Sequence, residues 1–247
     1  MKLSKCTAMN SIEVDHLTKK FGDFVAVNEI SFQVREGEIF GFLGANGAGK
    51  TTAIKMMSGL LQPTSGKAIV AGYDVTTQAK LIKRNIGYMS QRFSLYNDLT
   101  VFENMQLFGT IYKIPRTELK QRIMDSLAAL ELTKQANLLV NSIPLGWKQK
   151  LAFATAILHK PKIVFLDEPT SGVDPIVRRE FWNLIYQTAS TGVTILVTTH
   201  YMDEAEYCHR ISIMADGNIR LLGTPEELKQ QVGVSTINDV FVEYVKH

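Results

Sequence analysis

Long apolar runs and cysteines are scarce in this sequence of 247 residues. Its apolar stretches, such as AFATAIL at 152–158, fall far short of the roughly 20 residues that a helix needs to span a bilayer. We therefore expect a chain that does not itself cross a membrane. The two cysteines, Cys6 and Cys208, lack the spacing of metal ligands and predict two reduced cytosolic thiols. Internal repeats and low-complexity tracts are also absent, as in an ordinary globular protein.

A strong charge of one sign is missing too, since 27 Lys and Arg against 24 Asp and Glu give a net charge of +3. Nucleic-acid-binding proteins cluster basic residues on one face, and so mild an excess neither requires nor excludes such a partner. We expect no nucleic-acid partner. Residues 1–10, MKLSKCTAMN, contain the lysines of a signal peptide but no apolar segment behind them. They predict a disordered leader.

The apolar pattern predicts an α/β fold with a parallel sheet. Residues 11–34 alternate between apolar and polar, which is typical of half-buried antiparallel strands. Near-continuous apolar runs, typical of strands covered on both faces, follow at 38–44, 162–168 and 192–200. Helical spacing at 50–60 and 174–190 separates strand from strand, which is the alternation of a parallel sheet.

The remaining patterns predict how the single domain is organised. Residues 92–158 carry apolar residues at helical spacing almost throughout and predict an inserted helical subdomain. A hairpin about Asp216 and Gly217 is expected next, followed by a helix with Thr224 as its N-cap. We expect one domain over 11–247, with a core from 11–91 and 159–223, the helical subdomain over 92–158, and a C-terminal helical tail over 224–247.

The stretch GANGAGKTT at 44–52 matches the P-loop pattern G-x-x-x-x-G-K-[ST], between an expected strand and an expected helix. Glycines let backbone N–H groups approach phosphate oxygens, the lysine reaches the β- and γ-phosphates, and the threonine hydroxyl is offered to Mg²⁺. The pattern does not choose among kinases, GTPases and ATPases. The predicted nucleotide-binding residues are Gly44, Ala45, Asn46, Gly47, Ala48, Gly49, Lys50, Thr51 and Thr52.

Two carboxylates, Asp167 and Glu168, are expected at the carboxyl end of the strand over 162–168, where ligands gather in open α/β sheets. Asp167 is predicted to hold Mg²⁺ together with Thr51, and Glu168 to polarise the attacking water. Standing alone, such a pair is also consistent with a solvated turn that caps a helix. Beside a P-loop, the catalytic interpretation is favoured.

These residues resemble the ATP-binding subunits of ABC transporters, from about Ile12 to about Val245. The segments KKFGDFVAV, GYMSQRFSLY, FLDEPTSGVDP and LVTTHYMDEAE stand in the order of that family's motifs. The resemblance implies that Phe21 stacks on adenine, that Gln91 contacts Mg²⁺ and couples to the membrane subunit, and that His200 contacts the γ-phosphate. It also implies a D-loop at the dimer interface, formed by Ser171, Gly172, Val173 and Asp174.

Singly, these residues have plainer interpretations: Phe21 as a core aromatic, Gln91 as a surface polar residue and His200 as a capping histidine. Their joint order favours the family roles. The other three histidines that we considered, His16, His159 and His209, match no role in the family and are expected to be structural.

The sequence departs from the family at the signature motif, usually LSGGQ. The five aligned positions are Ile143, Pro144, Leu145, Gly146 and Trp147. Proline in place of serine removes one hydroxyl donor to the partner's nucleotide, while a glycine still lets backbone at a helix N-terminus approach an anion. Losing a hydrogen bond to a charged group costs about 1.5 to 3 kcal/mol, so we expect turnover to be about ten- to a hundredfold slower, not abolished.

The resemblance implies a P-loop ATPase with a RecA-like parallel-sheet core, an N-terminal antiparallel β subdomain and an inserted α-helical subdomain. It further implies ATP and Mg²⁺ as cofactors, a separate integral-membrane permease, a second ATPase subunit in a homodimer or heterodimer, and a place at the cytoplasmic face of the membrane. The segments MSQRFSLYNDLTVFENM, PLGWKQKLA and INDVFVEYV look most like the drug-export branch. The alternatives are a soluble ABC-type ATPase of ribosomes or chromosomes, and a nucleotide-gated regulator that does not hydrolyse ATP.

Overall fold

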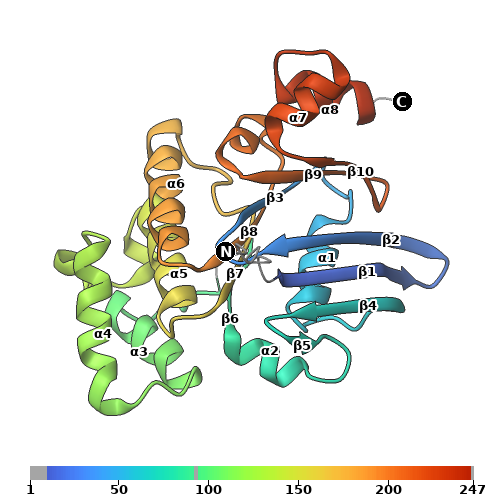
Figure 1. Cartoon of the computed structure of the whole chain (residues 1–247). Helices are drawn as coiled ribbons and strands as arrows, with labels where there is room; N and C mark the ends of the chain where they lie inside the picture. Colours follow the sequence, from blue (N-terminus) through green and yellow to red (C-terminus); the bar gives the residue numbers. More distant parts are fainter. Residues whose placement is uncertain (1–9, 92–93, 246–247) are drawn as a thin grey trace, which may run out of the picture.

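The computed structural model describes residues 10–91 and 94–245, and this part of the chain contains an antiparallel and a mainly parallel β-sheet (Figure 1). The antiparallel sheet has four strands in the described chain: β2 (Phe24–Arg35), β1 (Asn10–Phe21), β4 (Ser65–Val70) and β5 (Tyr73–Asp74), in this spatial order. The predicted antiparallel pairing of β1 with β2 is confirmed. Asn10 belongs to β1, although the expected leader included it, and residues 1–9 lie outside the described residues.

The second sheet forms the centre of the molecule. Its strands, in spatial order within the described chain, are β10 (Asn218–Gly223), β9 (Arg210–Ala215), β3 (Ile39–Leu43), β8 (Thr194–Thr199), β7 (Ile163–Asp167) and β6 (Ile86–Met89). All neighbours from β9 to β6 pair in parallel, and β10 pairs with β9 antiparallel. The three strands predicted from continuous apolar runs, β3, β8 and β7, are adjacent, and every residue in them is buried. The predicted α/β fold is therefore confirmed.

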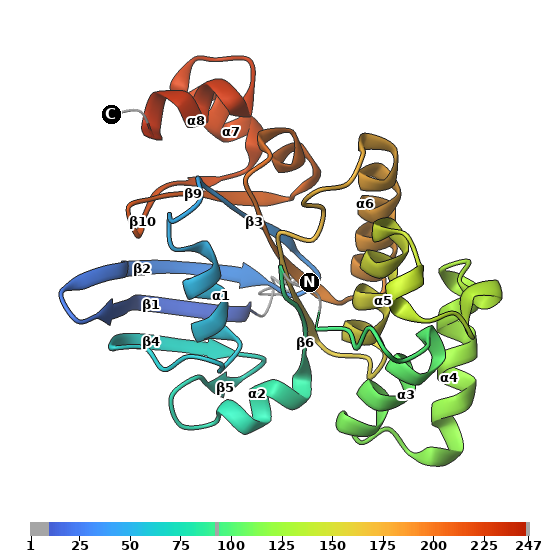
Figure 2. The same ribbon diagram turned by 180° about the vertical axis from the view of Figure 1, so that it is seen from behind.

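Helices cover both faces of this central sheet. Helix α1 (Lys50–Met57) lies between the two sheets, and its Ile54 belongs to the same core cluster as Phe42 of β3 (Figures 1 and 2). Because successive strand residues point to opposite faces, Leu43 packs instead in the cluster of Trp182, which lies on α6 (Pro175–Ser190). The chain runs from β5 to β6 through the short helix α2 (Ala79–Asn85).

The helical subdomain stands beside the central sheet, away from the antiparallel strands (Figures 1 and 2). It consists of α3 (Val101–Ile111), α4 (Arg116–Ala129), the single turns η1 (Thr133–Gln135) and η2 (Val140–Ser142), and α5 (Leu145–Ile157). A hydrophobic core of its own joins α3, α4 and α5. The prediction of helix almost throughout 92–158 is too broad, because 94–100 has no helix and 92–93 lie outside the described residues. Thr100 ends this segment as a capping box with Glu103.

The C-terminal part confirms two local predictions. The β9–β10 hairpin turns at Asp216 (φ 49°) and Gly217 (φ 76°), the positive-φ pair that a two-residue hairpin turn of type I′ needs. Thr224 caps α7 (Pro225–Val232) with its side chain. The final helix, α8 (Ile237–Val245), lies against η3 (Met202–Tyr207), which follows β8. Within the described residues, we find no helix with both the length and the apolar character for crossing a bilayer.

Candidate nucleotide-binding and catalytic site

The P-loop connects the carboxyl end of β3 to the first turn of α1. Gly49 adopts φ 103° at the N-cap, and a Cβ atom on it would lie 2.5 Å from the carbonyl oxygen of Ala26. A Cβ atom on Gly44 would lie 2.5 Å from the carbonyl oxygen of Met214. Glycine is therefore required at both positions by close backbone approach and, at Gly49, by the left-handed conformation. Among the described residues no side chain caps α1, so backbone N–H groups of its first turn remain for an anion.

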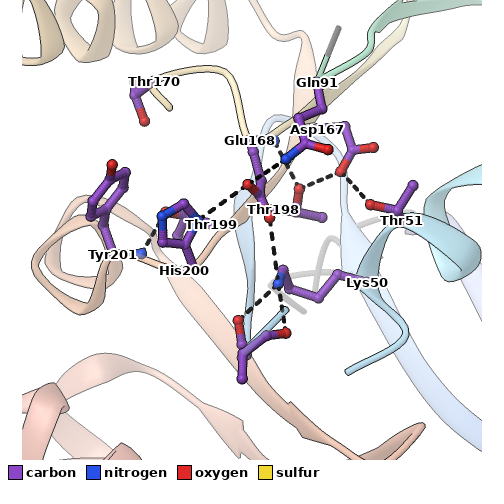
Figure 3. A network of polar contacts seen from close by, with 12 residues as sticks. Lys50, Thr51, Gln91, Asp167, Glu168, Thr170, Thr198, Thr199, His200 and Tyr201 are labelled. Atoms are coloured by element: carbon purple, nitrogen blue, oxygen red, sulfur yellow. Dashed lines mark hydrogen bonds and ion pairs between the residues drawn. The ribbon is translucent and has the colours of Figure 1, made fainter. Parts of the chain in front are cut away.

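Lys50, the first residue of α1, is only 4% exposed and points back into this loop (Figure 3). Its Nζ donates hydrogen bonds to the carbonyl oxygens of Gly44 (2.8 Å) and Ala45 (3.1 Å). It also lies 3.6 Å from Oε1 of Glu168. Burial lowers the pKa of Lys50, and the nearby Glu168 carboxylate opposes that shift.

Thr51 and Asp167 form the adjoining part of the site. The Thr51 hydroxyl donates to Asp167 Oδ1 (3.0 Å), and so does the hydroxyl of Thr198 on β8 (2.8 Å). Asp167 is 2% exposed, and burial raises its pKa while these two hydrogen bonds lower it. A hydroxyl and a carboxylate side by side are hard oxygen donors, which is the ligand chemistry that Mg²⁺ prefers. The residues present therefore fit a magnesium ion.

Glu168 is the point at which the other predicted catalytic residues meet (Figure 3). Its Oε2 accepts a hydrogen bond from Nε2 of Gln91 (2.9 Å) and lies 3.2 Å from Nδ1 of His200. Its backbone has φ 49°, an uncommon conformation for a residue with a side chain. The structure thus brings Lys50, Gln91, Glu168 and His200 together from four separate segments of the chain.

Thr198 is a site residue that our sequence analysis missed. Besides its bond to Asp167, its hydroxyl accepts a hydrogen bond from the backbone N–H of Glu168 (2.9 Å). It is fully buried and so fixes the directions of two neighbouring residues, Asp167 and Glu168. The available signal was the presence of threonines in a strand predicted to be buried, because a buried hydroxyl requires a hydrogen-bonding partner.

Phe21 lies outside this polar cluster, at the end of β1 in the turn to β2. Its side chain is 51% exposed, and Nζ of Lys19 lies 5.2 Å from the ring centroid. Phe21 is therefore not a core aromatic, and its exposed ring is available for stacking on a flat ligand.

The signature positions lie at the start of α5, where Gly146 faces α6. Ile143 is buried, Pro144 is the N-cap, and Leu145 is 43% exposed. A Cβ atom on Gly146 would lie 2.8 Å from Cγ1 of Val177, so this glycine permits close contact between the two helices. Trp147 packs partly against the core of the helical subdomain.

The predicted D-loop joins Glu168 to α6. The N–H of Ser171 donates to the carbonyl oxygen of Glu168 (3.2 Å). Gly172 (φ 79°) faces the Leu145 side chain, and Val173 leads on to Asp174. The Asp174 carboxylate caps α6 by accepting hydrogen bonds from the N–H groups of residues 176 and 177 (3.0 and 3.1 Å).

The three histidines without a family role bond elsewhere. Nδ1 of His209 accepts from the N–H of Ile39 (2.9 Å), and Nε2 of His159 lies 3.0 Å from the carbonyl oxygen of Ile86. His16 pairs with the exposed Asp15 on β1. None of these bonds reaches a residue of the polar cluster around Glu168.

A parallel sheet whose first βα turn is a P-loop, with carboxylates at the end of a neighbouring strand, defines a P-loop nucleoside triphosphatase. The family model described as ABC transporter matches residues 27–171. The chain therefore belongs to the ABC transporter family and is an ABC-type ATPase domain.

Two curated relatives illustrate the similarity. The probable multidrug ABC transporter ATP-binding protein YbhF of Escherichia coli (strain K12) is 50% identical over 220 residues, which cover 89% of this chain and 38% of YbhF. The linearmycin resistance ATP-binding protein LnrL of Bacillus subtilis (strain 168) is 35% identical over 244 residues, which cover 95% of this chain and 78% of LnrL.

Solved structures agree in fold. An ATP-binding subunit of an ABC transporter superposes with a TM-score of 0.85 at 28% identity, covering 94% of this chain and 98% of that one. The ATP-binding cassette MJ0796, in a dimeric post-hydrolysis state bound to ADP and Pi, superposes with a TM-score of 0.78 at 27% identity, covering 86% and 98%. The predicted P-loop ATPase fold, with its β subdomain and helical subdomain, is thereby confirmed.

Proposed function

We propose that this chain binds and hydrolyses ATP to drive a separate membrane permease, which exports drugs or other small molecules. The observation that carries the proposal is the convergence of Lys50, Gln91 and His200 on the buried carboxylate of Glu168. A general base must lie within hydrogen-bond reach of the water whose proton it takes, and the contacts of Gln91 and His200 with Glu168 Oε2 hold the carboxylate in one direction.

Each side chain has a distinct task in this mechanism. Backbone N–H groups of the P-loop and Lys50 bind the phosphates, and Phe21 stacks on the adenine. Glu168 accepts a proton from the attacking water, which Gln91 helps to orient, while His200 stabilises charge on the γ-phosphate. Thr51 and Asp167, with Gln91, would hold Mg²⁺, which when bound neutralises charge on the phosphates.

The signature and the D-loop act in a second subunit's site. In the proposed dimer, the N-terminus of α5 contacts the γ-phosphate bound by the partner subunit through backbone at Gly146, without the usual serine hydroxyl. ATP then favours the closed dimer because it binds that state better than the open one, and hydrolysis removes this difference. Closure moves the permease, to which Gln91 is coupled, at the cytoplasmic face of the membrane.

The proposed export role rests on the two relatives, whose names describe a multidrug transporter subunit and a linearmycin resistance protein. It extends to this chain by similarity, and the partner subunit is either a second copy or a related ATPase. Co-purification with an integral-membrane protein is expected. Sedimentation with ribosomes or DNA instead would contradict the transport role.

The direct test is steady-state ATP hydrolysis by the purified chain beside the Glu168→Gln variant, with dimerisation followed by light scattering in the same samples. Glutamine keeps the shape of the side chain but cannot accept the proton. We therefore expect the wild-type chain to hydrolyse ATP, and the Glu168→Gln variant to bind ATP and stall as a dimer. Equal turnover in the two proteins would remove Glu168 as the general base.

A further inference from the structure

A second polar cluster lies beside the catalytic residues and has no part in the proposed chemistry. It contains Thr170, Arg178, Tyr201, Asp203 and Glu204, which we call the α6–η3 cluster because Arg178 lies on α6 and Glu204 on η3. Thr170 donates its hydroxyl hydrogen to Glu204 Oε1 (2.5 Å), and Nε of Arg178 lies 3.6 Å from the same oxygen. Nη1 of Arg178 lies 3.3 Å from Oδ2 of Asp203.

The centre of this cluster is withdrawn from water. Glu204 is fully buried and Thr170 is 1% exposed, while the Arg178 side chain keeps 16% of its surface exposed. Among the described residues, Glu204 Oε2 and Arg178 Nε have no hydrogen-bonding partner. A buried carboxylate is costly to desolvate, and replacing such a pair by apolar residues is often neutral or stabilising. The stability of the folded state is therefore a weak reason for a charged pair at Arg178 and Glu204.

The cluster is joined to both catalytic groups that flank the proposed water. Thr170 is two residues from Glu168, and the next residue, Ser171, returns a hydrogen bond to the Glu168 carbonyl oxygen (3.2 Å). On the other side, the guanidinium carbon of Arg178 lies 3.9 Å from the ring centroid of Tyr201. The Tyr201 ring is in turn 4.2 Å from the imidazole of His200, centroid to centroid.

Figure 3 draws Thr170 and Tyr201 on the side of Glu168 where His200 lies, away from Thr51 and Asp167. Glu204 thus fixes the segment that follows the base, while Arg178 fixes the residue that follows the histidine. Because Arg178 and Glu204 also face each other, the two segments are tied together.

We propose that Arg178 and Glu204 are positioning residues that, through Thr170 and Tyr201, hold Glu168 and His200 in the relative geometry needed for hydrolysis. This inference rests on the proposed function. An error of about 1 Å in the placement of a catalytic group can cost on the order of a hundredfold in rate, so a pair that touches no substrate can still control kcat.

The sharpest test removes one hydroxyl and then restores it. Thr170→Val keeps the shape of the side chain but leaves Glu204 without its hydrogen-bond donor, whereas Thr170→Ser keeps the hydroxyl. We expect Thr170→Val to lower kcat by about tenfold with KM for ATP changed by less than about twofold, and Thr170→Ser to retain most of the wild-type kcat. Arg179→Ala, at an exposed position next to Arg178 on α6, is the matched control and should match wild type.

A merely structural role would lower the melting temperature of Thr170→Val without changing kcat separately from KM. The proposal is overturned if Thr170→Val retains wild-type kcat, or if Thr170→Ser loses as much as Thr170→Val. An additional expectation is that Arg178→Lys, which keeps the charge but loses the planar group over Tyr201, behaves like Thr170→Val.

Hydrogen exchange separates this inference from the proposed function. If wild type hydrolyses no ATP, the proposed function fails, but the link between the segments is still measurable. Backbone amides of η3, such as the Glu204 N–H bonded to the Tyr201 carbonyl oxygen, should exchange faster in Thr170→Val than in wild type or Arg179→Ala. Equal exchange in all three proteins would show that Thr170 does not hold this segment.

Discussion

Lys50 and Glu168 form a buried ion pair, with Nζ 3.6 Å from Oε1 and side chains 4% and 7% exposed. The residue assigned to bind phosphate is thus bonded to the residue assigned to activate water, as well as to two carbonyl oxygens of the P-loop. A triphosphate entering the loop competes for the same ammonium group. Nucleotide binding and release of the catalytic carboxylate are therefore expected to be linked.

Replacing Lys50 should weaken the binding of ATP. We expect Lys50→Ala to bind ATP about ten- to a hundredfold more weakly, because charge-assisted hydrogen bonds to the phosphates are lost. Calorimetric titration with ATP measures this. Lys80→Ala, at an exposed position of α2, is the control and should bind like wild type. Equal affinities of Lys50→Ala and wild type would remove Lys50 from the phosphate site.

Restoring the usual signature should speed ATP turnover. Pro144→Ser with Leu145→Gly returns the hydroxyl donor at the N-cap of α5, and we expect steady-state hydrolysis to rise by about tenfold. The nearby Ser142 does not stand in for it, because its hydroxyl donates to the carbonyl oxygen of Leu139 (2.7 Å). Ser142→Ala should accordingly hydrolyse ATP like wild type. Unchanged turnover in the restored variant would mean that the altered signature is no handicap.

The effect of Gly146→Ala on folding stability should depend on the side chain at position 177. Gly146→Ala brings a Cβ to 2.8 Å from the valine methyl, and overpacking of about 1 to 3 kcal/mol outweighs the gain in helix propensity of up to about 1 kcal/mol. The variant should therefore be less stable than wild type in urea unfolding. In a Val177→Ala background the overlap is gone, so Gly146→Ala should be neutral or stabilising. Destabilisation of equal size in both backgrounds would contradict the packing argument.

His159 should make folding stability depend on pH. Burial lowers its pKa from 6.5 to about 4, although its bond to the Ile86 carbonyl oxygen opposes that shift, and its ring stacks on Tyr112 at 3.7 Å between centroids. Between these two pKa values the unfolded chain binds a proton that the folded chain does not, so stability is present above 6.5 and is lost as pH falls toward 4.

The matching variant is His159→Gln, whose amide N–H replaces the donor to Ile86. Its melting temperature should fall less than that of wild type between about pH 7.5 and about pH 5, because the titrating group is gone. The comparison at the higher pH gives the cost of the substitution itself. Parallel curves for the two proteins would exclude His159 as the source of acid sensitivity.

Much of the fold could be predicted because short stretches of the sequence determine its strands and helix ends. The continuous apolar runs identified β3, β7 and β8, and capping residues such as Thr224 marked helix starts. The segment from β4 through α2 was not identified, because its strands are short, half exposed and interrupted by glycine. β4 exists as a strand because it pairs with β1, which lies about fifty residues earlier, and local patterns do not encode such pairing.

By itself, the sequence determined the residue types of the site and their order: a glycine loop, a lysine, a glutamine, two carboxylates and a histidine. The tertiary structure alone decided which of them meet, through the left-handed backbone of Glu168, the hydrogen bonds of Thr198 to its neighbours, and the salt bridge between Arg178 and Glu204. The physical reason is the separation along the chain of the residues that interact. Backbone geometry and capping depend on neighbours a few residues away, whereas buried polar groups are satisfied by partners that only the packing of distant segments supplies.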